Sequence, residues 1–216
     1  CTGRHRPLHH RDIASLTFIR YTIQYMAKLY FRYSAMNSGK TTALIQVAYN
    51  YEERDMKVVI IKPAVDTKGS SKIVSRIGLK RNADIVLDHE ASAKDALKPY
   101  GKIDCVLVDE AQFLAPLQVD ELFWYAVEND TPVMAYGLRT DFKMVGFPGA
   151  TRLLEIAHDL QEIKTICRCG RKAILNGRKV NGEFVFEGDQ VAIEGKDNVD
   201  YESLCASCYK RYSIPV

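Results

Sequence analysis

Four consecutive residues, Ser38-Gly39-Lys40-Thr41, have the types and order from which proteins build phosphate sites. In the motif G-x-x-x-x-G-K-[ST], loop N–H groups and a helix N-terminus face the phosphates, the lysine neutralises them, and the hydroxyl ligates Mg²⁺. Ser34 stands where that motif has its first glycine. Because Ser34 carries a Cβ atom, it can serve there only if its φ angle stays negative. The stretch is therefore a candidate nucleotide loop, and a chance match at a helix start is the alternative.

A second candidate group is the carboxylate pair Asp109 and Glu110, which ends the apolar run 104–110. A carboxylate at the carboxyl edge of a sheet is placed to organise Mg²⁺ beside the phosphates. At the end of a strand, Glu110 can turn toward an acceptor and act as a base. An acidic pair capping a surface turn is the alternative. The functional interpretation is favoured because the pair lies downstream of a candidate phosphate loop.

Four cysteines in the last 50 residues have the spacing of metal ligands. They form a C-x-C pair, Cys167 and Cys169, and a C-x-x-C pair, Cys205 and Cys208. Four thiolates suit a tetrahedral, structural Zn²⁺ site. Disulfides are the alternative, but they are rare in a reducing cytosol. Arg76 and Arg139 could meet phosphates, although exposed ion pairs are the more frequent fate of such arginines.

The composition is that of a soluble globular protein, with 47% hydrophobic and 26% charged residues. The net charge of +3 arises entirely within residues 1–25, since the other 191 residues carry 26 basic and 26 acidic groups. A nucleic-acid-binding face needs clustered lysines and arginines, so we expect no nucleic-acid partner. No run of 18 apolar residues occurs, which argues against a spanning helix and a membrane partner.

Residues 1–25 form a leader that begins with Cys1 rather than methionine. It does not fit a signal peptide, because Arg20 interrupts its apolar part and no small-residue cleavage site follows. We expect a leader or an appended extension that is poorly ordered, with the working protein beginning near Met26. Without a secretory signal, a cytoplasmic location is expected.

The remaining chain alternates between strand-like and helical patterns. After Lys40, apolar residues recur at helical spacing, so the loop should open an amphipathic helix. Strands that are apolar on both faces and alternate with helices indicate a mainly parallel sheet covered on both sides. The predicted strands are 28–33, 57–63, 83–87, 104–110 and 132–137, and further predicted helices are 117–127 and 151–157.

The pattern changes after about Lys164. Asn-Gly dipeptides at 176–177 and 181–182 and the short runs EFVFEG and QVAIEG suggest hairpins. We therefore predict an α/β fold, a P-loop NTPase-like sheet with helices on both faces, plus a small zinc-ribbon-like β module. The predicted divisions are 1–25 for the leader, 26–163 for the P-loop kinase domain and 164–216 for the zinc module.

Five segments in register resemble one family. The segments YSAMNSGKTTAL, VLVDEAQFL, YGLRTDF, KTICRCGRKA and YESLC..CYK resemble, in order and nearly in wording, the thymidine kinases of many bacteria and of animal cytosol. The resemblance covers essentially everything from Met26 to the C-terminus. Some bacterial members are similar in carrying serine at the first loop position, and they share the C-x-C pair.

The resemblance implies the residues of the site. Glu110 would be the catalytic base. A lasso-like loop, 190–203, would close over the thymine base of the substrate. In this loop, Glu194-Gly195 stands where similar relatives often have Gly-Gly. The nucleotide-binding residues would be Ser34, Ala35, Met36, Asn37, Ser38, Gly39, Lys40, Thr41, Asp109, Glu110, Ala111 and Gln112. The substrate-binding residues would be Met36, Phe113, Leu138, Phe142, Ile193 and Tyr201, several of which periodicity alone would assign to the core.

The resemblance also implies the activity. ATP would donate its γ-phosphoryl group to the 5′-hydroxyl of thymidine, with Mg²⁺ bridging the phosphates, for deoxynucleotide salvage and DNA precursor supply. A structural Zn²⁺ on Cys167, Cys169, Cys205 and Cys208 would hold the ends of the lasso. A homotetramer and feedback inhibition by dTTP are expected. The alternative is a nucleic-acid-dependent ATPase with a zinc ribbon, which the neutral body disfavours.

Overall fold

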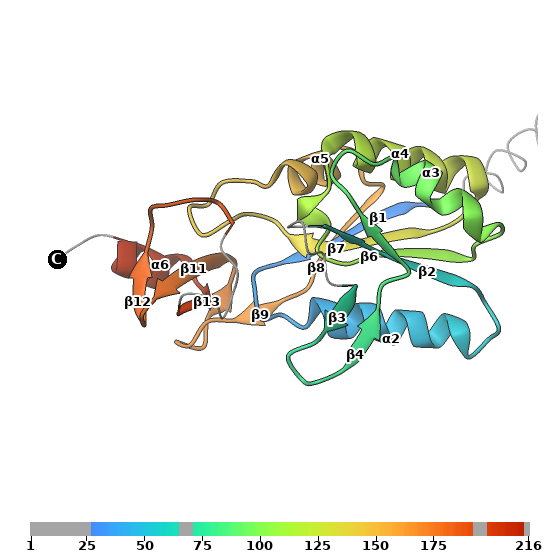
Figure 1. Ribbon diagram of the computed structural model, residues 1–216. Helices are drawn as coiled ribbons and strands as arrows, with labels where there is room; N and C mark the ends of the chain where they lie inside the picture. Colours follow the sequence, from blue (N-terminus) through green and yellow to red (C-terminus); the bar gives the residue numbers. More distant parts are fainter. Residues whose placement is uncertain (1–26, 65–70, 192–197, 214–216) are drawn as a thin grey trace, which may run out of the picture.

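The structure is a computed structural model that describes residues 27–64, 71–191 and 198–213 (Figure 1). The predicted leader, 1–25, lies outside the described residues. So does Ile193 of the predicted substrate pocket. No helix in the described part of the chain is long and apolar enough to cross a membrane.

A six-stranded sheet organises the first part of the chain, in the order β5-β2-β6-β7-β1-β8. All neighbouring strands pair in parallel, which confirms the predicted sheet. The five predicted strands are β1 (Leu29–Ser34), β2 (Val58–Pro63), β5 (Ile85–Leu87), β6 (Cys105–Val108) and β7 (Val133–Leu138). The sixth, β8 (Asp159–Glu162), was not predicted.

Helices cover both faces of this sheet, as predicted. Helix α2 (Lys40–Glu52) lies on one face, and α3 (Ala93–Leu97), α4 (Pro116–Asn129) and α5 (Pro148–Ile156) lie on the other (Figure 1). Strand β6 shows why both faces must be apolar. Val106 and Val108 belong to one core cluster, whereas Cys105 and Leu107 belong to the other. Successive side chains of a strand point to opposite faces, so a central strand is apolar throughout.

Four short elements complete the described part of this region. The short strands β3 (Lys72–Val74) and β4 (Lys80–Asn82) form an antiparallel hairpin that sequence patterns did not predict. The 3₁₀ helices η1 (Lys98–Tyr100) and η2 (Ala111–Phe113) follow α3 and β6. The position of η2, directly after the carboxylate pair, makes it part of the candidate site.

An antiparallel module follows the parallel sheet and lies at one end of it (Figure 1). Strands β9 (Thr165–Ile166) and β10 (Lys172–Ala173) pair with each other, and β12 (Glu183–Val185), β11 (Leu175–Val180) and β13 (Val199–Leu204) form a sheet in that order. Helix α6 (Ala206–Ser213) packs against it. The antiparallel module thus begins close to the predicted boundary near 164, and the division into domains remains a prediction.

The two Asn-Gly dipeptides have different outcomes. Asn181-Gly182 connects β11 to β12 with φ angles of 53° and 85°, as a two-residue hairpin turn with left-handed residues requires. Asn176-Gly177 lies inside β11 instead, so the turn predicted there is wrong. The predicted run QVAIEG falls largely on 192–197, outside the described residues.

Candidate functional site

The phosphate-loop residues connect β1 to α2, the arrangement that the motif requires. Asn37 and Gly39 have φ angles of 60° and 81°, left-handed values that turn the loop sharply before the helix begins at Lys40. Ser34 is not among the described residues with a positive φ angle. Serine therefore replaces the first glycine of the motif without backbone strain.

Lys40 is held inside the loop by its ammonium group. Its Nζ atom donates hydrogen bonds to Ser34 Oγ and to the Ala35 carbonyl, both at 3.1 Å. Ser34 Oγ also lies 2.5 Å from Ser38 Oγ. Burial lowers the pKa of Lys40, and the nearby charges of Glu110 and Asp109 oppose this effect. The Ser34 hydroxyl thus gives the lysine a partner that a glycine could not.

Asp109 directly follows β6 and is buried, with 4% of its surface exposed. Its N–H group donates to the Ile61 carbonyl at 3.0 Å, which continues the parallel ladder to β2. Burial, followed by the charge of Glu110, raises the pKa of Asp109 to about 7. A cation near this carboxylate would favour its charged form. The geometry therefore provides one buried carboxylate suited to a divalent metal ion.

Glu110 adopts a backbone conformation that is unusual for its residue type. Its φ angle is 51°, and such angles at non-glycine residues concentrate at functional sites. Gln112 Nε2 donates to Glu110 Oε2 at 2.6 Å, and Gln112 Oε1 accepts from the Leu138 N–H at 3.0 Å. The Gln112 amide thereby fixes the Glu110 carboxylate against the end of β7.

Gly137 makes this arrangement possible, and sequence reasoning missed it. A Cβ atom on Gly137 would lie 2.8 Å from Gln112 Oε1 and 3.0 Å from the Gln112 backbone nitrogen. Any side chain would push η2 away from the strand. The available signal was a glycine inside the apolar run 132–137, which often marks close backbone approach.

A cavity of about 390 Å³ opens beside the loop. Its wall combines the phosphate loop with Glu110, Leu138 and the β3–β4 hairpin. Sequence patterns did not predict that the hairpin would face the loop, and it brings Arg76, a candidate phosphate contact, into the cavity lining. The lining residues are Met36, Asn37, Ser38, Gly39, Lys40, Thr41, Thr42, Val74, Ser75, Arg76, Ile77, Glu110 and Leu138.

The other predicted site residues lie outside this lining. Asp109, Ala111 and Gln112 are buried. Phe113 packs edge-on against Phe147, with ring centroids 5.5 Å apart. Their predicted roles as nucleotide or substrate ligands stay predictions.

Phe142 and Tyr201 both contact Arg178, a residue that sequence reasoning did not single out. The Arg178 guanidinium carbon lies 3.7 Å from the centre of the Phe142 ring. Its Nε atom donates to Tyr201 Oη at 3.1 Å. The two predicted base-pocket aromatics are therefore brought together, and their roles as ligands also stay predictions.

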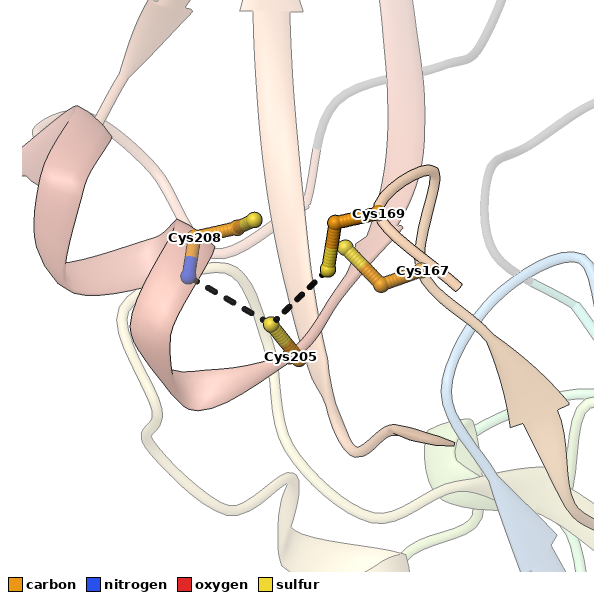
Figure 2. A group of neighbouring side chains, drawn as sticks. All are labelled: Cys167, Cys169, Cys205 and Cys208. Carbon is orange, nitrogen blue, oxygen red and sulfur yellow. Dashed lines mark hydrogen bonds between the residues drawn. The ribbon is translucent and has the colours of Figure 1, made fainter. Parts of the chain in front are cut away.

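The four predicted cysteines converge on one point (Figure 2), with their Sγ atoms within 4.8 Å of one another. Cys169 Sγ and Cys205 Sγ are 3.6 Å apart, much farther than the roughly 2.05 Å of a disulfide. All four are free cysteines, so the disulfide alternative is wrong. Zn–S bonds of about 2.3 Å place tetrahedral sulfurs about 3.8 Å apart. The four side chains therefore fit zinc.

The chemistry of the cluster also fits a cation. The Cys208 N–H group donates to Cys205 Sγ at 3.4 Å. This backbone hydrogen bond, together with hydrogen bonds from the neighbouring thiols, lowers the pKa of Cys205 to about 6, whereas hydrogen bonds within the cluster raise the pKa of Cys208. Thiolates are the form that binds metal.

Comparison with known proteins gives concordant matches. A family model described as thymidine kinase matches residues 27–209. Thymidine kinases of Ruegeria pomeroyi and Legionella pneumophila (strain Paris) are 46% and 48% identical, over 83% and 86% of this chain and 92% and 90% of theirs. A thymidine kinase of Rhodopirellula baltica is 44% identical over 86% of this chain and 89% of its own. The chain belongs to the thymidine kinase family.

Proposed function

We propose that the cavity beside the phosphate loop is where the γ-phosphoryl group of ATP passes to the 5′-hydroxyl of thymidine, with Glu110 as the base. Membership of the family makes the protein an ATP-dependent phosphotransferase. The observation that supports the proposed site is that Glu110 and Lys40 line the same cavity. A base and a phosphate-neutralising cation then face one reacting centre.

The phosphate loop would hold the triphosphate. Its backbone N–H groups and the N-terminus of α2 favour negative charge, and Lys40 adds a full positive charge. The Thr41 hydroxyl and the Asp109 carboxylate would hold Mg²⁺. Bound there, the ion would neutralise charge on the phosphate oxygens. The buried position of Asp109 supports this assignment, because its charged form lacks solvent and benefits from a cation.

Glu110 would accept the proton of the 5′-hydroxyl as the reaction proceeds. The new bond forms between the 5′-oxygen and the γ-phosphorus, and the bond from that phosphorus to ADP breaks. The proton passes from the hydroxyl to the carboxylate. The Gln112 hydrogen bond supports this role, because it fixes the carboxylate orientation before substrate binds.

The substrate side of the site is assigned from the family resemblance. Met36 and Leu138 would contact the thymine ring of the substrate, and their place in the cavity wall supports this. Phe142 and Tyr201 would complete the pocket with the lasso, part of which lies outside the described residues. The four cysteines would hold a structural zinc that fixes the ends of the lasso. A homotetramer, inhibition by dTTP and a cytoplasmic location rest on the resemblance alone.

The substitution Glu110→Gln tests the base directly. It preserves the side-chain shape and removes the proton acceptor, so thymidine phosphorylation should fall by about 10²- to 10⁴-fold. ATP binding, measured by calorimetry, should persist because the phosphate loop is unchanged. Glu90→Gln is the control, since the Glu90 side chain is almost fully exposed. Near-parental turnover in the Glu110 variant would refute the assigned role.

A further inference from the structure

Strand β11 presents two chemically different faces. Gly177 faces the interior of the module, since a Cβ atom there would lie 2.6 Å from the Phe184 ring and 2.7 Å from Leu204 Cδ1. Because side chains alternate along a strand, Asn176 and Arg178 point the other way. Both are buried, with exposed fractions of 2% and 5%. Buried polar groups are almost always hydrogen-bonded, so their partners identify what this face is for.

The Asn176 amide joins two segments that are far apart in the sequence. Its Oδ1 atom accepts a hydrogen bond from the Met36 N–H at 2.8 Å. Its Nδ2 group donates to the Thr140 carbonyl at 2.7 Å. Met36 belongs to the phosphate loop, and Thr140 follows the end of β7. A carboxamide offers both an acceptor and a donor, and Asn176 uses one of each.

Met36 and Asn37 of the phosphate loop both form hydrogen bonds with the antiparallel module. The Met36 N–H is engaged by Asn176. Asn37 adds two contacts, because its Nδ2 group donates to the Tyr201 carbonyl at 3.2 Å and its own carbonyl accepts from Thr165 Oγ1 at 3.3 Å. Of these contacts, only those of Asn176 are made by a fully buried side chain that also reaches the loop after β7.

The segments that Asn176 joins form the wall of the cavity. Met36 lines it from the phosphate loop, and Leu138, two residues before Thr140, lines it from the end of β7. We propose that Asn176 is a positioning residue that holds these two segments together as one wall of the thymidine site. This inference rests on the proposed function. If the 5-methyl group of thymine lies against Met36 and Leu138, displacing the wall should weaken discrimination between thymidine and deoxyuridine.

Two substitutions separate the two hydrogen bonds. Asn176→Leu keeps a similar shape and removes both bonds, which leaves two buried backbone groups unpaired. We expect kcat/KM for thymidine to fall about 10- to 100-fold and the preference for thymidine over deoxyuridine to fall at least about threefold. Asn176→Asp keeps the acceptor for Met36 but sets a carboxylate oxygen against the Thr140 carbonyl. It should be intermediate, and it provides a second test if the leucine variant does not fold.

Ser203→Ala is the matched control. Ser203 lies opposite Asn176 on β13, and its hydroxyl donates to the Ile166 carbonyl at 3.3 Å, within the module. It should change stability without changing the thymidine to deoxyuridine preference. A parental preference in both folded Asn176 variants would overturn the inference, even if both rates fell together. A parent protein without thymidine-dependent turnover would instead overturn the proposed function itself, and the inference with it.

Discussion

Ser34 and Lys40 show how far individual residues could be predicted. The Gly-Lys-Thr sequence identified the loop because its chemistry is local and its spacing is fixed. The hydrogen bond between Lys40 and Ser34 lies within six residues and explains why serine serves in the loop. The contacts of Gly137 and Asn176 could not be read in this way. Each depends on which distant segment the fold brings within 3 Å.

Asp109 carries a testable dependence of stability on pH. Its pKa of about 7 in the folded protein exceeds the roughly 3.9 of an unfolded chain. The folded state therefore retains a proton that the unfolded chain releases. The stabilising contribution is complete below about pH 4 and is lost as the pH rises through about 7. Without nucleotide or Mg²⁺, Asp109→Asn should unfold several degrees above the parent at pH 8 and near the parent at pH 4.

Calorimetric unfolding at both pH values checks this expectation. Asp88→Asn is the control, because Asp88 is an exposed residue that follows β5, another strand of the same parallel sheet. It should show no gain that depends on pH. An equal gain for Asp109→Asn at pH 4 and pH 8 would contradict the account, because ionisation of the carboxylate would then not be the cause.

At the scale of elements, hydrophobicity decided what could be predicted. The central strands are apolar on both faces because helices cover both, so their runs stand out in the sequence. Strand β8 reads DLQE, and strand β4 reads KRN with its side chains half-buried or exposed. β8 lies at an edge of the sheet, and β4 pairs with β3 alone among the described residues. Such strands need less apolar surface, so periodicity does not reveal them.

The antiparallel module provides the prediction at this scale. We expect about one zinc ion per chain, measured by atomic emission. Replacing Cys205 and Cys208 together by serine should abolish zinc binding, lower the unfolding midpoint and weaken thymidine binding, because a structural site contributes folding energy. The weakened binding should follow from the bonds between the module and the phosphate loop, such as that from Asn176 to Met36.

Cys105→Ala is the matched control for the zinc experiment. Cys105 is a fully buried cysteine in β6, far from the cluster in sequence and in a different core cluster. Its loss should affect stability and leave the zinc content unchanged. A metal-free preparation that remains fully active and stable would contradict the structural role of the four cysteines.

In the whole molecule, the parallel sheet and the antiparallel module meet at the phosphate loop. The parallel sheet supplies the phosphate loop and the carboxylates, and the antiparallel module reaches the loop through Asn176, Thr165 and Tyr201. Tyr209 Oη also donates to the Phe142 carbonyl at 2.7 Å, which ties α6 to the loop after β7. The proposed thymidine site would therefore draw on both parts of the chain. The contacts between these two parts could not be predicted from the sequence, because no motif includes residues of both.

A comparison of nucleosides tests the central claim, thymidine phosphorylation, most directly. ADP release should be measured with ATP plus thymidine, deoxyuridine, deoxycytidine or DNA. Thymidine should be the best substrate, and deoxyuridine should remain a poorer one because it lacks only a methyl contact. If backbone groups of the lasso form hydrogen bonds with the thymine base, deoxycytidine reverses two of these bonds and should be rejected at least roughly 30-fold. DNA should not stimulate turnover. Equal use of deoxycytidine and thymidine, or turnover that requires DNA, would contradict the account.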